Sequence, residues 1–361
     1  MIYLHVPFCR SFCTYCDFYS EIACRGRDAQ LFEQYADAVC AEASRRRDEI
    51  EATRDLNTLY IGGGTPSVLP LSYISSFADV IGESPFTEFT VEVNPEDIVE
   101  KGEAYVRGLL ELGVNRVSMG VQSLDDGILR WMKRRHDAAH ARQAFEILRR
   151  AGVENISVDL IFGLSQLSEA VLAETLRELV AWRPEHVSAY QLSIEDGSAL
   201  GRMVREGRYA EAPQEQCAAQ YRLLCDTLRD AGYNHYEISN WALPGREAVH
   251  NSGYWSRLPY VGLGPGAHSF DGTTRSWNPT SLRHSGELPP ETTEALSEAE
   301  VREETIMLGL RTARGIPEGL ADAVRTAEML ADGRLVRTAE GRLRIPEDRW
   351  FVSDDIMADL I

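Results

Sequence analysis

Three cysteines lie close together near the start of the chain, in the segment IYLHVPFCRSFCTYCDFYS (2–20). Cys9, Cys13 and Cys16 have the spacing C-x3-C-x2-C and follow a short apolar run that is typical of a β-strand. Thiolates are soft ligands, which in proteins bind zinc or iron–sulfur clusters. A structural zinc site takes four ligands, and no fourth cysteine stands at a paired spacing nearby. The spacing therefore favours a cluster that leaves one iron without a protein ligand; a zinc site and a chance grouping are the alternatives.

Glycines and polar residues follow the next strand-like runs. The motif GGGTPS (62–67) has glycines that let the backbone approach a ligand closely, and an ordinary β/α turn is the alternative. Its spacing is not the G-x-G-x-x-G fingerprint of dinucleotide sites. Glu92, Gln122 and Asp159 lie in or at the ends of the third, fourth and fifth runs, and a carboxylate such as that of Glu92 can accept hydrogen bonds from ribose hydroxyls. Each residue alone is ordinary, but at successive strand ends they form one coherent site.

The order of the elements decides how these residues meet. Six β-rich runs alternate with amphipathic stretches whose apolar residues recur at three- and four-residue intervals. The runs are residues 2–6, 56–64, 89–96, 114–123, 155–164 and 186–195, and the clearest helical stretches are 31–43 and 139–152. Six such units imply right-handed crossovers and a parallel sheet. We therefore predict an α/β fold with a partial (β/α)6 TIM-like barrel, open on one side, with its active residues at the carboxyl ends of the strands.

The alternation ends after about residue 196. The chain then shows a helix, a strand-like run, a glycine-rich loop, and a tail made of a helix, a hairpin and a closing helix. These segments are residues 213–232, 233–242, 254–270, 297–315 and 333–346, followed by the closing helix. The order of the tail resembles a small α+β, winged-helix-like domain, although the segment lacks the basic helix of a DNA reader. We expect three parts, at residues 1–200, 201–290 and 291–361.

Composition and charge restrict the class of function. The chain has 361 residues and a formal net charge of −19. Because a phosphate backbone is bound through lysine and arginine, we expect no nucleic-acid partner. No apolar run approaches the ~20 residues of a transmembrane helix, and no signal-peptide pattern is evident, so we expect a cytoplasmic protein in which clustered cysteines bind metal. Four scattered cysteines receive no role: Cys24, Cys40, Cys217 and Cys225.

The cysteine motif after a first strand resembles that of radical S-adenosylmethionine (radical SAM) proteins, and the whole chain resembles their oxygen-independent coproporphyrinogen oxidase-like family. The resemblance implies a 4Fe-4S cluster on Cys9, Cys13 and Cys16, whose free iron chelates the amino and carboxylate groups of SAM. Electron transfer would then cleave the sulfonium to a 5′-deoxyadenosyl radical. The resemblance also implies a set of SAM contacts: Tyr3, Tyr15, Gly63, Gly64, Thr65, Glu92, Gln122, Arg134 and Asp159.

Two features favour a heme-chaperone branch of this family over its oxidases. The oxidases extend the motif to C-x3-C-x2-C-x-C, whereas Phe18 stands at the last position here. The segment HNSGYW (250–255) resembles the H-N-x-x-Y motif of the chaperone branch, with Ser252 where arginine is usual. The histidine of that motif is associated with heme. Neutral imidazole is a good axial ligand of heme iron, and tyrosine can be one, so the resemblance implies heme contacts at His250 and Tyr254.

The preferred hypothesis is a heme carrier that also binds a SAM-coordinating cluster and passes its heme to acceptor hemoproteins. The region 201–290 would then lie near the heme. The alternative is an enzyme, an oxygen-independent coproporphyrinogen III oxidase that consumes SAM and forms protoporphyrinogen IX. Methyl transfer to a tetrapyrrole and ferredoxin-like electron transfer are further alternatives, so whether the protein is an enzyme stays open. A homodimer and a peripheral membrane contact are compatible with the sequence.

Overall fold

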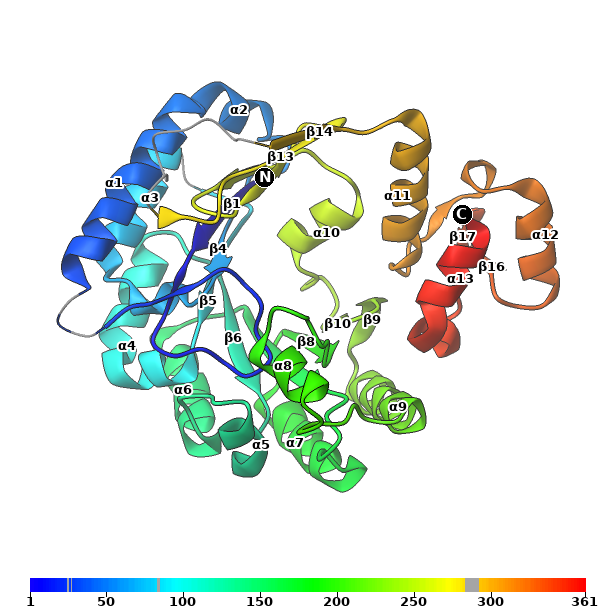
Figure 1. Cartoon of the computed structure of the whole chain (residues 1–361), viewed down its shortest axis with the longest axis horizontal. Helices are drawn as coiled ribbons and strands as arrows, with labels where there is room; N and C mark the ends of the chain where they lie inside the picture. The colour runs from blue at the N-terminus through cyan, green and yellow to red at the C-terminus, as the bar shows by residue number, and fades with distance from the viewer. Residues whose placement is uncertain (25, 27, 83–84, 283–291) are drawn as a thin grey trace.

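The computed structural model describes residues 1–361 except 25, 27, 83–84 and 283–291. Its centre is a nine-stranded sheet with the strand order β11-β1-β4-β5-β6-β7-β8-β10-β9. The strands from β1 to β8 in this order are parallel, and Figure 1 shows them curving into an arc. They are β1 (Ile2–Val6), β4 (Thr58–Gly63), β5 (Glu88–Val93), β6 (Arg116–Gln122), β7 (Ile156–Phe162) and β8 (His186–Gln191). Each overlaps one of the six predicted runs, so the predicted partial barrel is confirmed.

Helices cover the outer side of this arc (Figure 1). Their ends follow from the local sequence: the Asp137 side chain accepts a hydrogen bond from the backbone N–H of His140 at the start of α6, and Gly152 ends that helix with a φ of 101°. The helix buries an apolar stripe that includes Phe145 and Leu148. The outer helices are α1 (Ala29–Arg45), α2 (Arg47–Ala52), α3 (Leu71–Ile81), α4 (Pro95–Glu111), α6 (Ala138–Ala151), α7 (Glu169–Trp182) and α9 (Gln214–Asp230).

The two edges of the sheet correct the sequence-based prediction. The predicted run 233–242 is a hairpin of two strands, β9 (Asn234–Glu237) and β10 (Asn240–Ala242), which continues the sheet antiparallel to β8. The predicted loop 254–270 contains β11 (Val261–Leu263), which pairs in parallel with β1. The glycines there serve close packing, because a Cβ on Gly262 would collide with the carbonyl group of His268.

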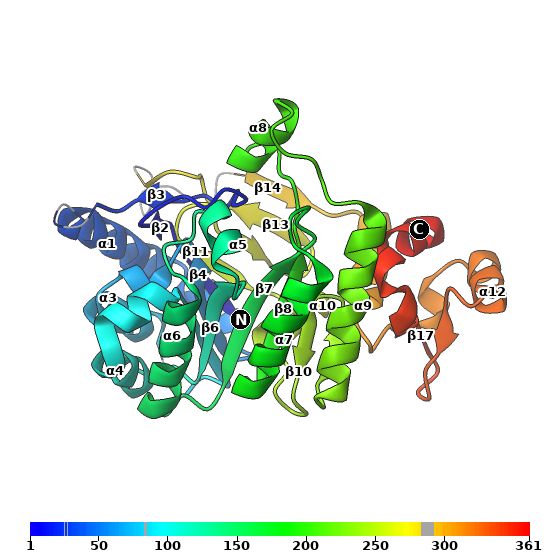
Figure 2. The same ribbon diagram turned by 90° about the horizontal axis from the view of Figure 1, so that it is seen from below.

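We call the carboxyl ends of the parallel strands the mouth of the barrel and their amino ends its floor. Figure 2 shows two short helices, α5 (Asp126–Trp131) and α8 (Ala199–Arg205), at the mouth. The helix α10 (Val249–Trp255) lies on the open side of the arc in Figure 1. The carboxylate of Glu88, the first residue of β5, accepts hydrogen bonds from the N-terminal backbone of α10, which places the start of this helix at the floor.

The remaining elements form two small sheets beside the barrel. One is antiparallel, with the strands β12 (His268–Phe270), β13 (Thr274–Trp277) and β14 (Thr292–Ala295). The other belongs to the predicted winged-helix-like tail, which consists of α11 (Glu298–Leu310), β15 (Ile316–Pro317), α12 (Ala323–Ala331), β16 (Val336–Arg337), β17 (Arg342–Arg344) and α13 (Ser353–Leu360). Within the described residues, the 3-10 helices are Pro66–Val68, Glu318–Leu320 and Glu347–Val352. This α+β tail is confirmed; the domain boundary expected at 290/291 lies outside the described residues.

No described helix is long and apolar enough to span a bilayer.

Candidate functional site

The cysteine loop is fastened to the mouth of the barrel at both of its ends and in its middle. Two short parallel strands, β2 (Phe8–Cys9) and β3 (Glu21–Ile22), close the loop. In the middle, the buried Thr14 donates its backbone N–H to the carbonyl oxygen of Met132 (3.0 Å) and accepts from the N–H of Leu200 (2.9 Å). The loop is thus tied to the ends of two mouth helices, which holds the thiols over the strand ends. Thr14 carried no signal in the sequence beyond its place between two cysteines.

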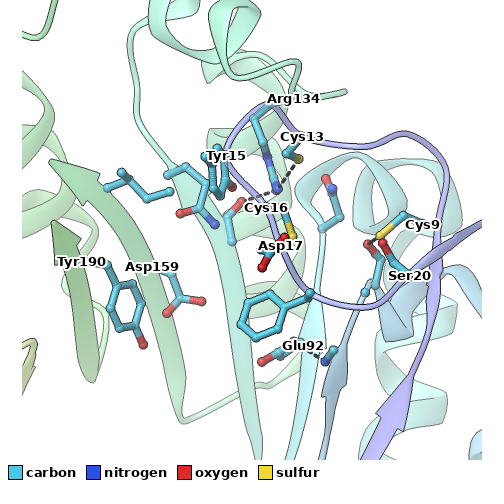
Figure 3. Close-up of a pocket in the computed structure, with 18 of the residues that line it drawn as sticks. Cys9, Cys13, Tyr15, Cys16, Asp17, Ser20, Glu92, Arg134, Asp159 and Tyr190 are labelled. Atoms are coloured by element: carbon cyan, nitrogen blue, oxygen red, sulfur yellow. Dashed lines mark hydrogen bonds between the residues drawn. The ribbon is translucent and has the colours of Figure 1, made fainter. Parts of the chain in front are cut away.

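The three thiols face a common cavity of about 960 Å³. Figure 3 shows Cys9, Cys13 and Cys16 on the loop and, across the cavity, Asp159 on β7. The Arg134 guanidinium lies 3.6 Å from Sγ of Cys13, so a positive charge lies beside this sulfur. Three soft donors that line one cavity, one of them beside an arginine, fit an iron–sulfur cluster, whose ligands are thiolates. Burial raises the pKa of Cys16 to about 11 in the metal-free chain, so binding of a metal must displace a proton from this thiol.

The glycine motif lies directly under the cysteine loop. The backbone N–H of Gly64 donates to the carbonyl oxygen of Val6 at 2.8 Å, and a Cβ on Gly64 would lie 2.7 Å from the carbonyl oxygen of Phe8. Only glycine therefore allows this close approach of β4 to the strand that carries Cys9. Thr65 follows, with its hydroxyl 3.6 Å from Sγ of Cys9. The motif was predicted to let the backbone approach a ligand; the structure shows that its Gly64 packs closely against the cysteine loop.

Glu92 lies in the wall of the cavity with a hydrogen bond to each carboxylate oxygen. The Tyr60 hydroxyl donates to Oε1 at 2.7 Å, and the backbone N–H of Gly63 donates to Oε2 at 3.1 Å. Burial raises the pKa of Glu92 to about 7, and these two hydrogen bonds oppose the shift. The pKa of Glu92 therefore lies near neutral pH, and its ionised carboxylate can accept hydrogen bonds from further donors in the cavity.

The other cavity residues expected from the resemblance also come together at the mouth. β6 contains a bulge near its end, and Gln122 has a positive φ of 66°, which turns its side chain into the cavity. Asp159 accepts from the Ser118 hydroxyl at 3.3 and 3.2 Å, and burial raises the pKa of its carboxyl. Tyr15 lines the cavity beside Arg134. Gln122 and Asp159 belong to the strands of the barrel wall, and Tyr15 belongs to the cysteine loop itself.

Tyr3 differs from the other expected SAM contacts. Its hydroxyl lies 3.0 Å from Nδ1 of His5, whose Nε2 lies 2.9 Å from the carbonyl oxygen of Tyr19. Because a carbonyl can only accept, the proton of His5 is on Nε2, so the Tyr3 hydroxyl donates to Nδ1. Tyr3 does not belong to the described residues that line the cavity. In this arrangement it positions His5 and the end of the cysteine loop.

The residues expected to contact heme lie at the floor. His250 is 1% exposed; its Nδ1 lies 2.8 Å from the hydroxyl of Thr58 and its Nε2 2.8 Å from the hydroxyl of Tyr254. Burial lowers the pKa of His250 to about 3, so the ring is neutral. Both ring nitrogens are therefore in use, and neither His250 nor Tyr254 is among the described residues that line the cavity, whereas the next residue, Asn251, is.

Several cavity residues were missed from the sequence although a signal was present. Polar residues occupy every second position along the parallel strands, which places them all on the inner face of the barrel. These residues are Thr58 and Tyr60 on β4, Glu88, Thr90 and Glu92 on β5, Arg116 and Ser118 on β6, Ser157 and Asp159 on β7, and His186, Ser188 and Tyr190 on β8. Parallel strands are ordinarily apolar on both faces. The alternation thus indicates a polar interior, and seven of these twelve side chains line the cavity.

A partial barrel with a three-cysteine loop over its mouth defines the class of radical SAM proteins, and the family model of the Radical SAM superfamily matches residues 3–179. Among solved structures, coproporphyrinogen III oxidase (HemN) from Escherichia coli, a radical SAM enzyme, is similar with a TM-score of 0.81 over 99% of this chain and 89% of that chain. At 20% identity this likeness bears on the fold alone.

Curated relatives are closer in sequence. The heme chaperone HemW from Bacillus subtilis (strain 168) is 35% identical over 326 residues, which cover 87% of this chain and 84% of the relative. The heme chaperone HemW from Mycobacterium tuberculosis (strain ATCC 25618 / H37Rv) is 34% identical over 364 residues, 95% of this chain and 92% of the relative. The chain belongs to the HemW family of radical SAM proteins.

Proposed function

We propose that this protein is a heme chaperone, which binds heme and a SAM-coordinating 4Fe-4S cluster and delivers the heme to acceptor hemoproteins in the cytoplasm. The observation that carries the proposal is its likeness, over most of its length, to proteins named heme chaperone HemW. The thiol loop and the polar cavity beneath it support a cluster and SAM as cofactors. The segment HNSGYW at the floor supports heme as the cargo.

The residues of the mouth have distinct tasks in this proposal. Cys9, Cys13 and Cys16 would hold the cluster, which when bound supplies an electron for reductive cleavage of SAM. Arg134 places a positive charge beside the Cys13 ligand, 3.6 Å from its Sγ. Glu92 accepts hydrogen bonds from the ribose hydroxyls of SAM in its ionised form. Thr14 keeps the loop in place while these ligands enter and leave.

The heme iron is assigned to His250 and Tyr254. Neutral imidazole binds iron, and His250 is neutral at physiological pH because burial lowers its pKa to about 3. Its Nε2 now shares a hydrogen bond with the hydroxyl of Tyr254. Iron binding at Nε2 therefore requires this bond to open, so heme binding in this proposal is coupled to a movement of α10. Tyr254 is one turn along the same helix and moves with it.

A heme titration of the full chain tests the proposal. We expect a Soret shift on heme addition, a weaker one in His250→Ala, and an unchanged one in the control His140→Ala, because His140 lies on the outer helix α6. Equal spectra of the wild type and His250→Ala would remove His250 from the site. Absence of heme binding in the wild type would refute the proposal that the protein is a heme carrier.

The rival function is the oxidase, and it has its own assay. The protein, carrying its reconstituted cluster, is incubated without oxygen with SAM, a reductant and coproporphyrinogen III, and the porphyrin products are followed. We expect no decarboxylation, because Phe18 stands where the oxidases have a further cysteine. Stoichiometric formation of protoporphyrinogen IX would defeat the carrier hypothesis.

A further inference from the structure

A buried arginine in the lower part of the cavity has no direct partner among the described residues. Arg116 begins β6, is 1% exposed and lines the cavity. Its Nε makes no hydrogen bond within the described part of the chain. Burial opposes the charge of the guanidinium, yet the carboxylates of Glu88 and Asp159 raise its pKa above the ordinary arginine value through charge alone. A buried cation of this kind is destabilising unless a further group satisfies its donors.

The other arginines that line the cavity have partners. Arg10 and Arg135 form ion pairs, and Arg134 donates hydrogen bonds to the backbone and to a thiol. The partners are Asp28 for Arg10, Glu96 and Asp97 for Arg135, and Gly120 and Cys13 for Arg134. Nε of Arg134 also lacks a partner, but Arg116 is the cavity arginine for which the described residues provide neither an ion pair nor a hydrogen bond. Although Glu88 and Asp159 act on this guanidinium through charge, its unused donors can bind an anion.

Arg116 lies at the opposite end of β6 from Gln122, one of the expected SAM contacts. Arg116 begins β6 and Gln122 ends it. At about 3.3 Å per residue these Cα atoms lie roughly 20 Å apart along the barrel. The proposed cluster, and with it the methionyl carboxylate of SAM, belongs to the cysteine loop at the mouth. This separation favours an anion of a second molecule that reaches into the barrel over the methionyl carboxylate.

We propose that Arg116 binds a carboxylate of this second molecule, namely a propionate of heme, with the amide of Asn251 as an additional donor. Asn251 lines the same cavity and follows His250, whose backbone N–H is held by Glu88 at the floor. A guanidinium matches a carboxylate with two parallel hydrogen bonds. Arg116 thereby supplies the positive charge that Ser252 does not provide in the segment HNSGYW. The inference rests on the proposed heme carrier and names the residue that recognises the acidic edge of its cargo.

The test compares hemin with hemin dimethyl ester, in which both carboxylates are masked. The wild-type protein with its reconstituted cluster is titrated with each, and we expect hemin to bind about tenfold or more tightly than the ester. In Arg116→Gln the affinity for hemin falls to that for the ester, while the affinity for the ester and for SAM stays within about twofold of the wild type. Arg116→Lys keeps part of the preference. The control Arg142→Gln, which removes an exposed charge on the outer helix α6, keeps all of it.

Each outcome decides a different question. Equal binding of hemin and the ester by the wild type overturns the inference and leaves the heme carrier intact, and this comparison holds even when Arg116→Gln fails to fold. A loss of SAM affinity in Arg116→Gln with hemin affinity unchanged assigns the guanidinium to SAM and also overturns it. Binding of neither porphyrin by the wild type refutes the heme carrier itself.

Discussion

Two groups of polar side chains, one at the floor of the barrel and one at its mouth, differ in whether they have hydrogen-bond partners within the protein. At the floor, both ring nitrogens of His250 and the carboxylate of Glu88 have partners within the protein. At the mouth, the thiols of Cys9 and Cys16 face a cavity, and the Thr65 hydroxyl lies 3.6 Å from Sγ of Cys9. Satisfied polar networks stabilise a fold, whereas donors that face a cavity are available to ligands. The hydrogen-bond network of His250 and Glu88 therefore stabilises the fold, whereas the thiols are available for binding, and variants at these two places must have different effects.

The largest expected effect is the loss of the cluster at the mouth. In Cys13→Ser, reconstituted without oxygen with iron and sulfide, we expect iron to fall from about four atoms per chain to less than about one, and the brown absorbance to disappear. The unfolding free energy of the metal-free protein stays nearly unchanged, because this thiol has no buried partner other than Arg134. Iron analysis and urea denaturation check both statements. Cys24→Ser, at an exposed thiol, is the control, and a brown Cys13→Ser protein would disprove the ligand assignment.

The converse effect belongs to the floor. In Glu88→Ala, the backbone N–H groups of Val249 and His250 lose their buried acceptor, and we expect the unfolding free energy to fall by about 2 to 3 kcal/mol. Cluster loading should be unaffected, since no thiol is touched. Urea denaturation and iron analysis of the same sample provide the comparison. The control is Glu174→Ala, at an exposed position of α7; equal stability of the two variants would contradict the distinction between floor and mouth.

Glu92 allows a third, smaller test through pH. Its pKa is raised to about 7, and we expect SAM to bind the ionised form, so the affinity falls as the pH drops through 7, by up to about tenfold between pH 8 and pH 6. The unliganded fold has the opposite dependence. Because the unfolded carboxyl has a pKa near 4.5, the contribution of Glu92 to stability is complete below pH 4.5 and is lost as the pH rises through 7.

Calorimetric titration with SAM at pH 6, 7 and 8 measures the effect. Glu92→Gln should bind SAM about tenfold more weakly at pH 8 and show no such dependence. The control variant Asp79→Asn, at the helix α3, should follow the wild type. A pH dependence that persists in Glu92→Gln would assign the titration to another group.

The sequence predicted the mouth better than the floor, for physical reasons. Cysteine spacing and strand-end carboxylates are local signals, since parallel strands bring their carboxyl ends to one edge whatever the details of packing. The orientation of the His250 side chain depends instead on contacts with residues far away in the sequence, such as the hydrogen bond with Thr58, which lies 192 residues earlier. The segment HNSGYW indicated which residues gather, but only the fold reveals that Asn251 faces the cavity and His250 the wall.

The edge strands were missed for a related reason. The glycines of the segment 254–270 indicated a loop, yet Gly262 lies within β11 because the neighbouring backbone leaves no room for a side chain. Composition alone does not distinguish a glycine that bends the chain from one that permits close packing. The alternating polar residues along β6 were a readable signal of the polar interior, and they pointed to Arg116.

The smallest expected effect concerns Phe18, which is 71% exposed on the cysteine loop. In Phe18→Cys we expect the iron content and the unfolding free energy to stay within error of the wild type, the latter within about 0.5 kcal/mol, because an exposed side chain with little packing is replaced. SAM affinity should change by less than about twofold, since three thiols already ligate the cluster and the fourth iron is left to SAM. Iron analysis, urea denaturation and SAM titration check this. A tenfold loss of SAM affinity would mean that the new thiolate has taken the iron that SAM requires, and position 18 would then lie within reach of the open corner.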